Sequence, residues 1–404
     1  MAETKMMSPE EEKAVKELKE RLQGTVDEDY GDDLLFYRFL KARDFNLNAA
    51  ESMLRKHLEW RKEKNIDEFM KTYTPPEILA KYFLLTDLGY DKDGCLVRYW
   101  PIGNVDFKGF FKCFKFSDLE KFFIYTHESE SKKLEEQSKK HGKRIYQVAY
   151  IYNIEGITFA KATDKKVIDT FITISNAFYA NYPERMKCSV VINTSPYFAL
   201  FFSVIKKFIP STTLSKINVF SSDEFKEFLL KEIDADQLPA FLGGTRTDPD
   251  GNPRCNSFVV HGGLIPEKHY IHKSKRSLAN MPGVKEITLS RASFHEEPVE
   301  VREGQSLLEW EFETKSRDIG FGLFYQDISS GEEKMVELVP IQRIDTDEYS
   351  ESGVFKCEKE GKYVILFDNT YSWLRPKEIF FKISVISPED HAKNFNCDIS
   401  ENGH

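Results

Sequence analysis

The chain has 404 residues, a formal net charge of −9 and a hydrophobic content of 41% that includes 33 Phe. This length predicts two or three domains with substantial cores. The sequence has no long block or stripe of Lys and Arg, which argues against nucleic acid as a partner. A polar N-terminus and the lack of an apolar run of about 18 residues predict neither a signal peptide nor a transmembrane helix.

Residue types that carry out chemistry are scattered rather than clustered. The six cysteines form no CxxC pair, which indicates reduced thiols and a cytoplasmic protein. The sequence has no GxSxG, GxGxxG, P-loop or HExxH motif, and no His and Cys residues at the spacing of a metal site. We therefore predict that the protein is not an enzyme and needs no cofactor or metal.

Residues 1–73 are predicted to form a helical N-terminal cap. Ser8-Pro9-Glu10-Glu11 is typical of a helix start, with a Ser N-cap, Pro at the first position and acidic residues in the first turn. Apolar residues at helical spacing continue through Asp32 to Arg43 and from about Asn48 to Asn65. We interpret His57, on the apolar side of the last segment, as a packed histidine rather than a ligand.

Residues 74–247 alternate between strand and helix patterns, which favours an α/β domain with a mainly parallel sheet. The predicted strands lie in Cys95–Trp100, Ile145–Ile154, Cys188–Asn193 and Ile217–Phe220, after a strand before the turn at Tyr90–Gly94. Helices are predicted for Ser117–His141, Asp164–Tyr182 and Asp223–Glu232.

A second domain is predicted after a linker of turn residues at Thr247–Pro253. From 254 to 388, eight short strands separated by Gly, Asp and Ser turns favour a β-sandwich of the jelly-roll type. The predicted strands are Lys285–Ser290, Pro298–Val301, Ser306–Glu313, Gly320–Tyr325, Lys334–Gln342, Gly353–Cys357, Lys362–Phe367 and Ile379–Ile386. Residues 389–404 are polar and are predicted to form a flexible tail.

The stretch Tyr197–Ile209 is apolar on more than one side of a helix. The row Phe201, Val204, Ile205 and Phe208 is apolar, and so is the row Phe198, Phe202, Ile205 and Ile209. A surface helix normally has one apolar stripe. Either the helix is sunk in a large core, or it faces the core on one side and lipid on the other. Lys206, Lys207 and the following Pro210 are compatible with contact at a membrane surface.

Several segments resemble the CRAL-TRIO family of lipid-binding proteins. They are Phe36–Arg43, Met53–Arg61, Tyr90–Val97, Asn181–Arg185 and Leu238–Gly244. Gly320-Phe321-Gly322 and Phe367–Trp373 resemble a GOLD domain, a β-sandwich of Golgi-associated proteins. The order of cap, CRAL-TRIO and GOLD is similar to the animal group of supernatant protein factor, also called tocopherol-associated protein.

This resemblance implies a carrier that hides one hydrophobic lipid behind a gate helix. It implies a headgroup site at Glu184, Lys216 and the hydroxyl of Thr158, although Phe159 and Ala160 depart from the hydroxyl series of members that bind choline lipids. The implied pocket residues are Tyr99, Tyr152, Ile168, Phe171, Ile172, Ser175, Phe178, Tyr179, Ile192 and Phe201. The implied gate residues are Phe198, Phe202, Ile205, Phe208 and Ile209, and Lys206 and Lys207 are implied to contact the membrane.

The resulting hypothesis is a carrier or exchanger of phosphatidylinositol, or of a tocopherol, retinoid or squalene-like ligand, that contacts membranes transiently. The alternative is a lipid-regulated adaptor whose GOLD-like domain binds a protein partner. Loss of cellular activity on removing the residues after Thr247, with lipid exchange kept, would favour the adaptor.

Overall fold

The computed structural model describes residues 7–26, 30–83, 85–114, 116–270, 278–327, 333–346, 350–373 and 375–390. The predicted tail therefore lies outside the described residues from 391 onward. The chain forms two compact units, both built from separate stretches. The first unit comprises the described residues within Met1–Ile157, Phe171–Pro196 and Lys206–His272, and the second comprises those within Thr158–Thr170, Tyr197–Ile205 and Lys273–His404.

The first unit begins with a small helical bundle, as the sequence predicts. Helices α1 (Pro9–Arg21), α2 (Asp33–Lys41) and α3 (Leu47–Glu63) pack around a common core that includes Leu18 and Phe39. Ser8 forms the predicted N-cap, in a capping box with Glu11. The short helices α4 (Ile66–Thr72) and α5 (Glu77–Tyr82) lead from the bundle to the sheet.

A five-stranded sheet forms the centre of the first unit. The strand order is β1-β2-β3-β4-β5, and β2 to β5 run parallel while β1 pairs antiparallel with β2. The strands are β1 (Thr86–Tyr90), β2 (Leu96–Trp100), β3 (Val148–Asn153), β4 (Met186–Ile192) and β5 (Ile217–Val219). The prediction of an α/β domain with a mainly parallel sheet is therefore confirmed.

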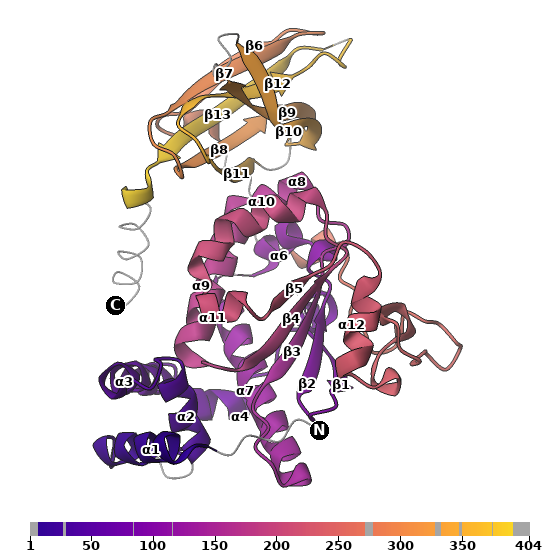
Figure 1. Ribbon diagram of the computed structural model, residues 1–404. Coiled ribbons are helices and arrows are strands. Elements are labelled where there is room, and N and C mark those ends of the chain that lie inside the picture. Colours follow the sequence, from indigo (N-terminus) through magenta and orange to yellow (C-terminus); the bar gives the residue numbers. More distant parts are fainter. Residues whose placement is uncertain are drawn as a thin grey trace. The chain divides into compact units, whose positions relative to one another are not determined.

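Helices cover both faces of this sheet (Figure 1). Phe225 and Leu229 of α12 (Glu224–Glu232) pack on one face with Val97 and Ile151. Leu134 of α7 (Phe116–His141) packs on the other face in a cluster with the strand residues Leu96, Val148 and Tyr150. Other helices of the chain are α6 (Phe107–Cys113), α8 (Phe159–Thr163), α9 (Lys165–Asn181), α10 (Pro196–Ile205) and α11 (Ser211–Leu214).

The second unit contains an eight-stranded β-sandwich. Its two antiparallel sheets have the orders β10-β9-β12-β7 and β11-β8-β13-β6. The strands are β6 (Lys285–Leu289), β7 (Phe294–Val301), β8 (Leu307–Thr314), β9 (Asp318–Asp327), β10 (Lys334–Asp345), β11 (Glu351–Lys356), β12 (Gly361–Asp368) and β13 (Lys377–Ile386). All eight predicted strands are present. The predicted strand begins at Pro298, whereas β7 begins at Phe294. The first residues of β7 include His295, Glu296 and Glu297, which hide the apolar alternation typical of a strand.

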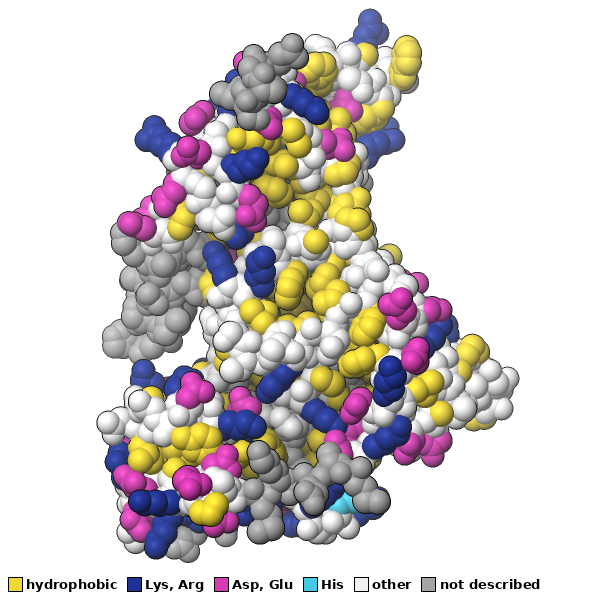
Figure 2. Space-filling model, viewed as in Figure 1, with side chains coloured by type: hydrophobic (Ala, Val, Ile, Leu, Met, Phe, Trp, Pro, Cys, Tyr) yellow, Lys and Arg dark blue, Asp and Glu magenta, His cyan; other side chains and the backbone are white. Residues whose placement is uncertain are grey.

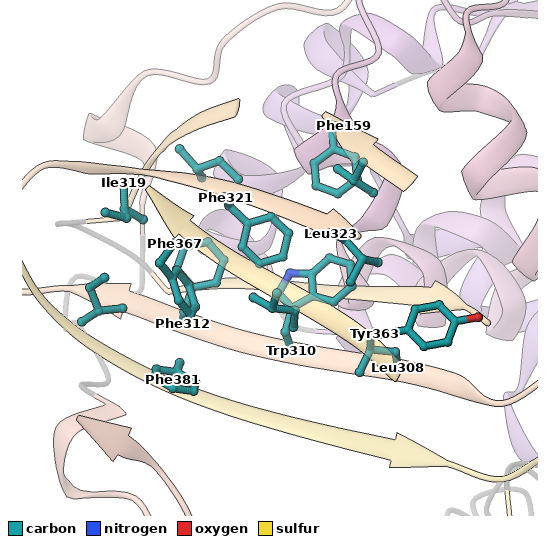
Figure 3. Packing of buried hydrophobic residues seen from close by; sticks show 14 of the residues in the cluster. Phe159, Leu308, Trp310, Phe312, Ile319, Phe321, Leu323, Tyr363, Phe367 and Phe381 are labelled. Carbon is teal, nitrogen blue, oxygen red and sulfur yellow. The ribbon is translucent and has the colours of Figure 1, made fainter. Parts of the chain in front are cut away.

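The core of the sandwich includes a residue from far outside its strands. Phe159 of α8 is 1% exposed and belongs to the same hydrophobic cluster as Trp310, Phe312 and Phe321. Figure 3 shows the Phe159 ring beside Phe321 and Leu323. Tyr197 and Leu200 of α10 also pack against this cluster. Segments that the sequence assigns to the α/β domain thus complete the sandwich core.

Two polar contacts accompany this packing. Lys165 Nζ lies 3.2 Å from Glu309 Oε1, and the amide of Gln342 donates to the Tyr197 hydroxyl at 3.4 Å. Asp164 also forms an isolated antiparallel bridge with Gly353 of β11. The segment 158–165 is therefore held to the sandwich by backbone, ionic and apolar contacts together.

Among the described residues, no helix is long and apolar enough to cross a membrane. Figure 2 shows Lys and Arg interspersed with Asp and Glu over the visible face, rather than a field of one sign.

Candidate functional site

A tight turn between α9 and β4 presents the carboxylate of Glu184. Asn181 ends α9, and Met186 begins β4, so the turn has only four residues. Glu184 has a φ of 57°, in the left-handed region that non-glycine residues seldom adopt. Such a conformation persists only where the surrounding structure holds it, and it is frequent at functional sites.

Two lysines from different elements converge on this carboxylate. Lys216, just before β5, places Nζ 3.4 Å from Glu184 Oε2 and 3.2 Å from the backbone oxygen of Met186. Lys41, the last residue of α2, places its Nζ 3.7 Å from the same Oε2 atom. We call Lys41, Glu184 and Lys216 the Glu184 cluster.

The cluster carries two cations for one anion and so has an excess positive charge. Its ion pairs are longer than the 2.7–2.9 Å that is usual for a close charge-assisted hydrogen bond. The side chains are 39% (Lys41), 13% (Glu184) and 25% (Lys216) exposed, so they are accessible from solvent. An arrangement of this kind can bind an anionic group without breaking a tight internal pair.

Sequence reasoning missed Lys41. Glu184 lies in the family segment Asn181–Arg185, and the resemblance implies a headgroup role for Lys216. The structure brings these two residues together. Lys41 lies in the segment Phe36–Arg43, which also carries the resemblance, but a lysine in the last turn of a helix is common because it complements the helix dipole. Nothing in its spacing relates it to a turn more than 140 residues later.

Some predicted pocket residues of the first unit lie on one face of the sheet. The Trp100 ring lies 6.2 Å from that of Tyr152 and 5.8 Å from that of Phe171, the first α9 residue assigned to this unit. Farther along α9, Ser175, Phe178 and Tyr179 are partly exposed, while Ile172 is buried. Phe178 packs against His127, at a ring distance of 5.0 Å.

Tyr99 and Ile192 lie on the opposite face. Both belong to the cluster that packs against α12, and both are at most 1% exposed. The reason is the alternation of side chains along a strand, which points Tyr99 and Trp100 to opposite sides of the sheet. The structure therefore does not bring Tyr99 and Ile192 together with Tyr152.

Two tyrosine hydroxyls on the Trp100 side are held in their neutral form. Burial raises the pKa of Tyr179 to about 12, and burial raises the pKa of Tyr152 well above its usual range, with Tyr179 adding to the rise. Both side chains nevertheless keep partly accessible surface. Both hydroxyls are therefore neutral hydrogen-bonding groups at neutral pH.

The other predicted site residues belong to the second unit. Ile168 and Phe201 are buried, and the rings of Phe198 and Phe202 stack at 5.5 Å. The Thr158 hydroxyl accepts from the amide of Lys161 and caps α8, so that it already has a structural role. Ile205 ends α10 and is half-buried.

The predicted helix Tyr197–Ile209 is shorter than expected. α10 ends at Ile205 and a 3-10 turn, η2 (Lys206–Phe208), follows. Pro210 explains the change, because proline disfavours helical geometry at the residue before it. Lys206 and Lys207 are exposed, whereas Phe208 and Ile209 are half-buried.

Comparison with known proteins agrees with the fold. Residues 80–244 match the family model described as "CRAL/TRIO domain", and residues 5–56 match "CRAL/TRIO, N-terminal domain". Protein ctg-1 of Caenorhabditis elegans is 25% identical over 350 residues, which cover 86% of this chain and 90% of that protein. Protein real-time of Aedes aegypti is 26% identical over 332 residues, and the matched region spans 50% of its length and 80% of this chain.

Among solved structures, that of Sfh5 is similar with a TM-score of 0.47 and 21% sequence identity, covering 64% of this chain and 95% of that one. The two family models together cover the helical bundle and the sheet described above. Residues 80–244 are therefore similar to a CRAL/TRIO domain, and the helical bundle before them is similar to the N-terminal domain that bears the same family name.

Proposed function

We propose that this chain is a carrier that sequesters one lipid and exchanges it at membranes, and that the Glu184 cluster binds the headgroup of phosphatidylinositol. The observation that supports the headgroup assignment is the convergence of Lys41 and Lys216 on one carboxylate. In a variant of this proposal, the chain carries tocopherol, a retinoid or a squalene-like ligand, which has no phosphate headgroup for the cluster to bind.

The chemistry of the cluster suits an inositol phosphate. An ammonium group binds a phosphate oxygen by a charge-assisted hydrogen bond, and a carboxylate accepts hydrogen bonds from sugar-like hydroxyls. A phosphate would draw Lys41 and Lys216 toward itself, and an inositol hydroxyl would replace them on Glu184. The exchange retains the hydrogen bonds of all three side chains.

Sequestration addresses the large cost of exposing a lipid to water. A two-chain lipid has roughly 30 methylenes, and at about 0.8 kcal/mol each their exposure costs on the order of 20 kcal/mol. An apolar protein surface makes the transfer from a bilayer nearly neutral. The partly exposed Phe171, Phe178 and Tyr179 on α9 and the aromatic Trp100 and Tyr152 on the sheet offer such a surface in the first unit.

The test is lipid uptake from vesicles by the full chain, followed by extraction and mass spectrometry. Lys41→Ala with Lys216→Ala should lower phosphatidylinositol uptake at least about tenfold, because two charge-assisted hydrogen bonds of about 1.5–3 kcal/mol each are lost. Uptake of tocopherol or a retinoid should be unchanged. The matched control is Glu227→Ala with Lys231→Ala, which removes an exposed ion pair of α12 in the same unit.

Equal loss of phosphatidylinositol and tocopherol uptake would show that the cluster is structural. Protein that takes up no lipid of either class would overturn the carrier itself. The proposal also includes the gate role of Phe198 to Ile209, the assignment of the sandwich to the GOLD family and membership in the supernatant protein factor group, which the resemblance of the sequence supports.

A further inference from the structure

One end of the sandwich exposes two large aromatic side chains on adjacent loops. Phe294, the first residue of β7, is 57% exposed, and Trp373, in the loop between β12 and β13, is 80% exposed. The two loops are joined by backbone hydrogen bonds, from Ala292 to Ser372 at 3.1 Å and from Asn369 to Ser293 at 2.9 Å. The segments that carry Phe294 and Trp373 are therefore adjacent at one end of the sandwich.

The loop that carries Trp373 is held in place from within. The side chain of Asn369 is fully buried, and its amide nitrogen donates to the backbone oxygens of Ser290 at 3.0 Å and Arg375 at 3.2 Å. The Ser372 hydroxyl also donates to Arg375 O at 3.1 Å. The exposed Trp373 side chain is therefore carried by an anchored loop.

Two basic residues lie close to these rings in the sequence, Arg291 three residues before Phe294 and Arg375 two residues after Trp373. Arg291 and Arg375 are exposed, and neither forms an ion pair with a carboxylate in the part of the chain that the structure describes. We call Arg291, Phe294, Trp373 and Arg375 the sandwich tip. It differs from an ordinary solvated surface because apolar rings and uncompensated guanidinium groups occur together.

The nearby carboxylates Asp318 and Asp368 already have partners. The Asp318 carboxylate is already engaged by Arg343 and by Lys377, and it accepts from the Tyr371 hydroxyl. The Asp368 carboxylate accepts from the backbone amide of Thr370 at 2.7 Å. Arg343 and Lys377 are thus paired with Asp318, whereas Arg291 and Arg375 have no carboxylate partner in the described part of the chain.

We propose that the sandwich tip docks on an anionic lipid bilayer, with the Trp373 and Phe294 rings at headgroup depth and the two arginines against lipid phosphates. Tryptophan favours the membrane–water interface because it has an apolar body and a polar N–H. Basic residues near an anionic leaflet each add about 1 kcal/mol, equivalent to about fivefold in partitioning. This contact is separate from the gate residues and would hold the carrier at a membrane independently of its cargo.

The test is flotation of the full chain with vesicles of phosphatidylcholine alone or with about one third phosphatidylserine. Binding should require the anionic lipid, and brominated acyl chains should quench tryptophan emission in the wild type but much less in Trp373→Phe. Arg291→Gln with Arg375→Gln should lower partitioning about 25-fold. Trp373→Ala should lower partitioning about tenfold, since it removes an aromatic side chain that becomes buried in the membrane interface on binding.

Two variants serve as matched controls. Arg302→Gln removes an exposed arginine just beyond the other end of β7, and Leu264→Ala removes an apolar side chain that is 84% exposed in the first unit. Neither should change partitioning. Hydrogen exchange across β7 and β12 checks that the tip variants keep the sandwich folded.

Wild-type binding by both tip variants, or the same quenching in Trp373→Phe as in wild type, would overturn the proposal. Loss of binding only in Lys206→Glu with Lys207→Glu would assign membrane contact to the gate region instead. Stable capture of another protein by the tip, without vesicle binding, would also overturn it. Failure of the headgroup proposal would appear separately, because Lys41→Ala with Lys216→Ala should still bind anionic vesicles.

Discussion

One buried site of the first unit and the core cluster of the second unit are built differently. In the first unit, the buried Arg98 guanidinium is bound by Asp87 at 2.7 Å and by Glu130 at 3.0 Å, and Glu130 also accepts from Tyr150. The cluster between the two sheets of the second unit instead consists of aromatic and aliphatic side chains, Phe159 among them. The Arg98 site depends on directional partners for buried charge, and the cluster around Phe159 depends on complementary shape.

Breaking the buried ion pair should have the largest effect on stability. Glu130→Ala leaves Arg98 without one carboxylate in a buried site and should lower the free energy of unfolding by up to about 5 kcal/mol. Hydrogen exchange in β2 and β3 would measure it. Glu130→Gln, which keeps an acceptor, should cost less. Equal exchange rates in Glu130→Ala and wild type would contradict a structural role for the pair.

Truncation of the aromatic contact should come next. Phe159→Ala should destabilise the sandwich by about 3 kcal/mol, at the lower end for this substitution because a short helix can shift toward the cavity. Protection should fall in β8 and β9 but not in β3. Phe225→Ala, at a buried phenylalanine of α12, is the reciprocal control and should lower protection in β3 but not in β8 or β9. Loss of protection in β3, β8 and β9 in both variants would show that the two units do not unfold separately.

A smaller effect should appear on acidification. His57 accepts from Tyr30 and donates to Asn181, and burial lowers its pKa to about 3. Because the unfolded chain binds the proton with a pKa near 6.5, stability contributed by neutral His57 is present above pH 6.5 and is lost as the pH falls. The loss between pH 7 and pH 5 should be about 2 kcal/mol.

Urea unfolding at the two pH values would measure this loss. His57→Gln should remove most of the pH dependence, whereas His141→Gln, at an exposed position, should leave it unchanged. The same slope in His57→Gln as in wild type would mean that other groups cause the acid sensitivity.

The smallest stability effect is expected at the Glu184 cluster. Lys41→Ala should change the free energy of unfolding by less than about 0.5 kcal/mol, because the pair is long and 39% of the lysine side chain is exposed. Phosphatidylinositol uptake should nevertheless fall several-fold. A stability loss as large as that of Glu130→Ala would place the cluster with the structural ion pairs.

Most strands and long helices could be predicted from the sequence because their patterns are local. The eight strands of the sandwich and the alternation around the sheet depend on residue types within a few positions. The burial of Phe159 in the sandwich could not be predicted in this way, because its partners Trp310 and Phe321 are far along the chain. Part of the apolar surface of Tyr197–Ile209 also serves contacts with residues far along the chain, since Tyr197 and Leu200 pack against the sandwich core.

The candidate site was predictable only in part, for a similar reason. The family resemblance implied Glu184 and Lys216, but Lys41 reaches the cluster through the packing of the helical bundle. The pocket prediction treated Tyr99 and Tyr152 as equivalent, and the assignment of each to a face of the sheet depends on register. Register is a property of the paired strands, which place Tyr152 beside Trp100 and Tyr99 beside Ile151, and residue type alone does not determine it.

The contribution of Phe159 to the sandwich also affects synthesis of the chain. Phe159 leaves the ribosome roughly 160 residues before Phe321, its partner in the core. At 5–20 residues per second this delay is on the order of 10 s, and α10 waits for a similar time with Tyr197 and Leu200 uncovered. During that interval the nascent chain displays aromatic surface that only the completed C-terminal strands can cover, which makes it a natural substrate for chaperones that bind growing polypeptides.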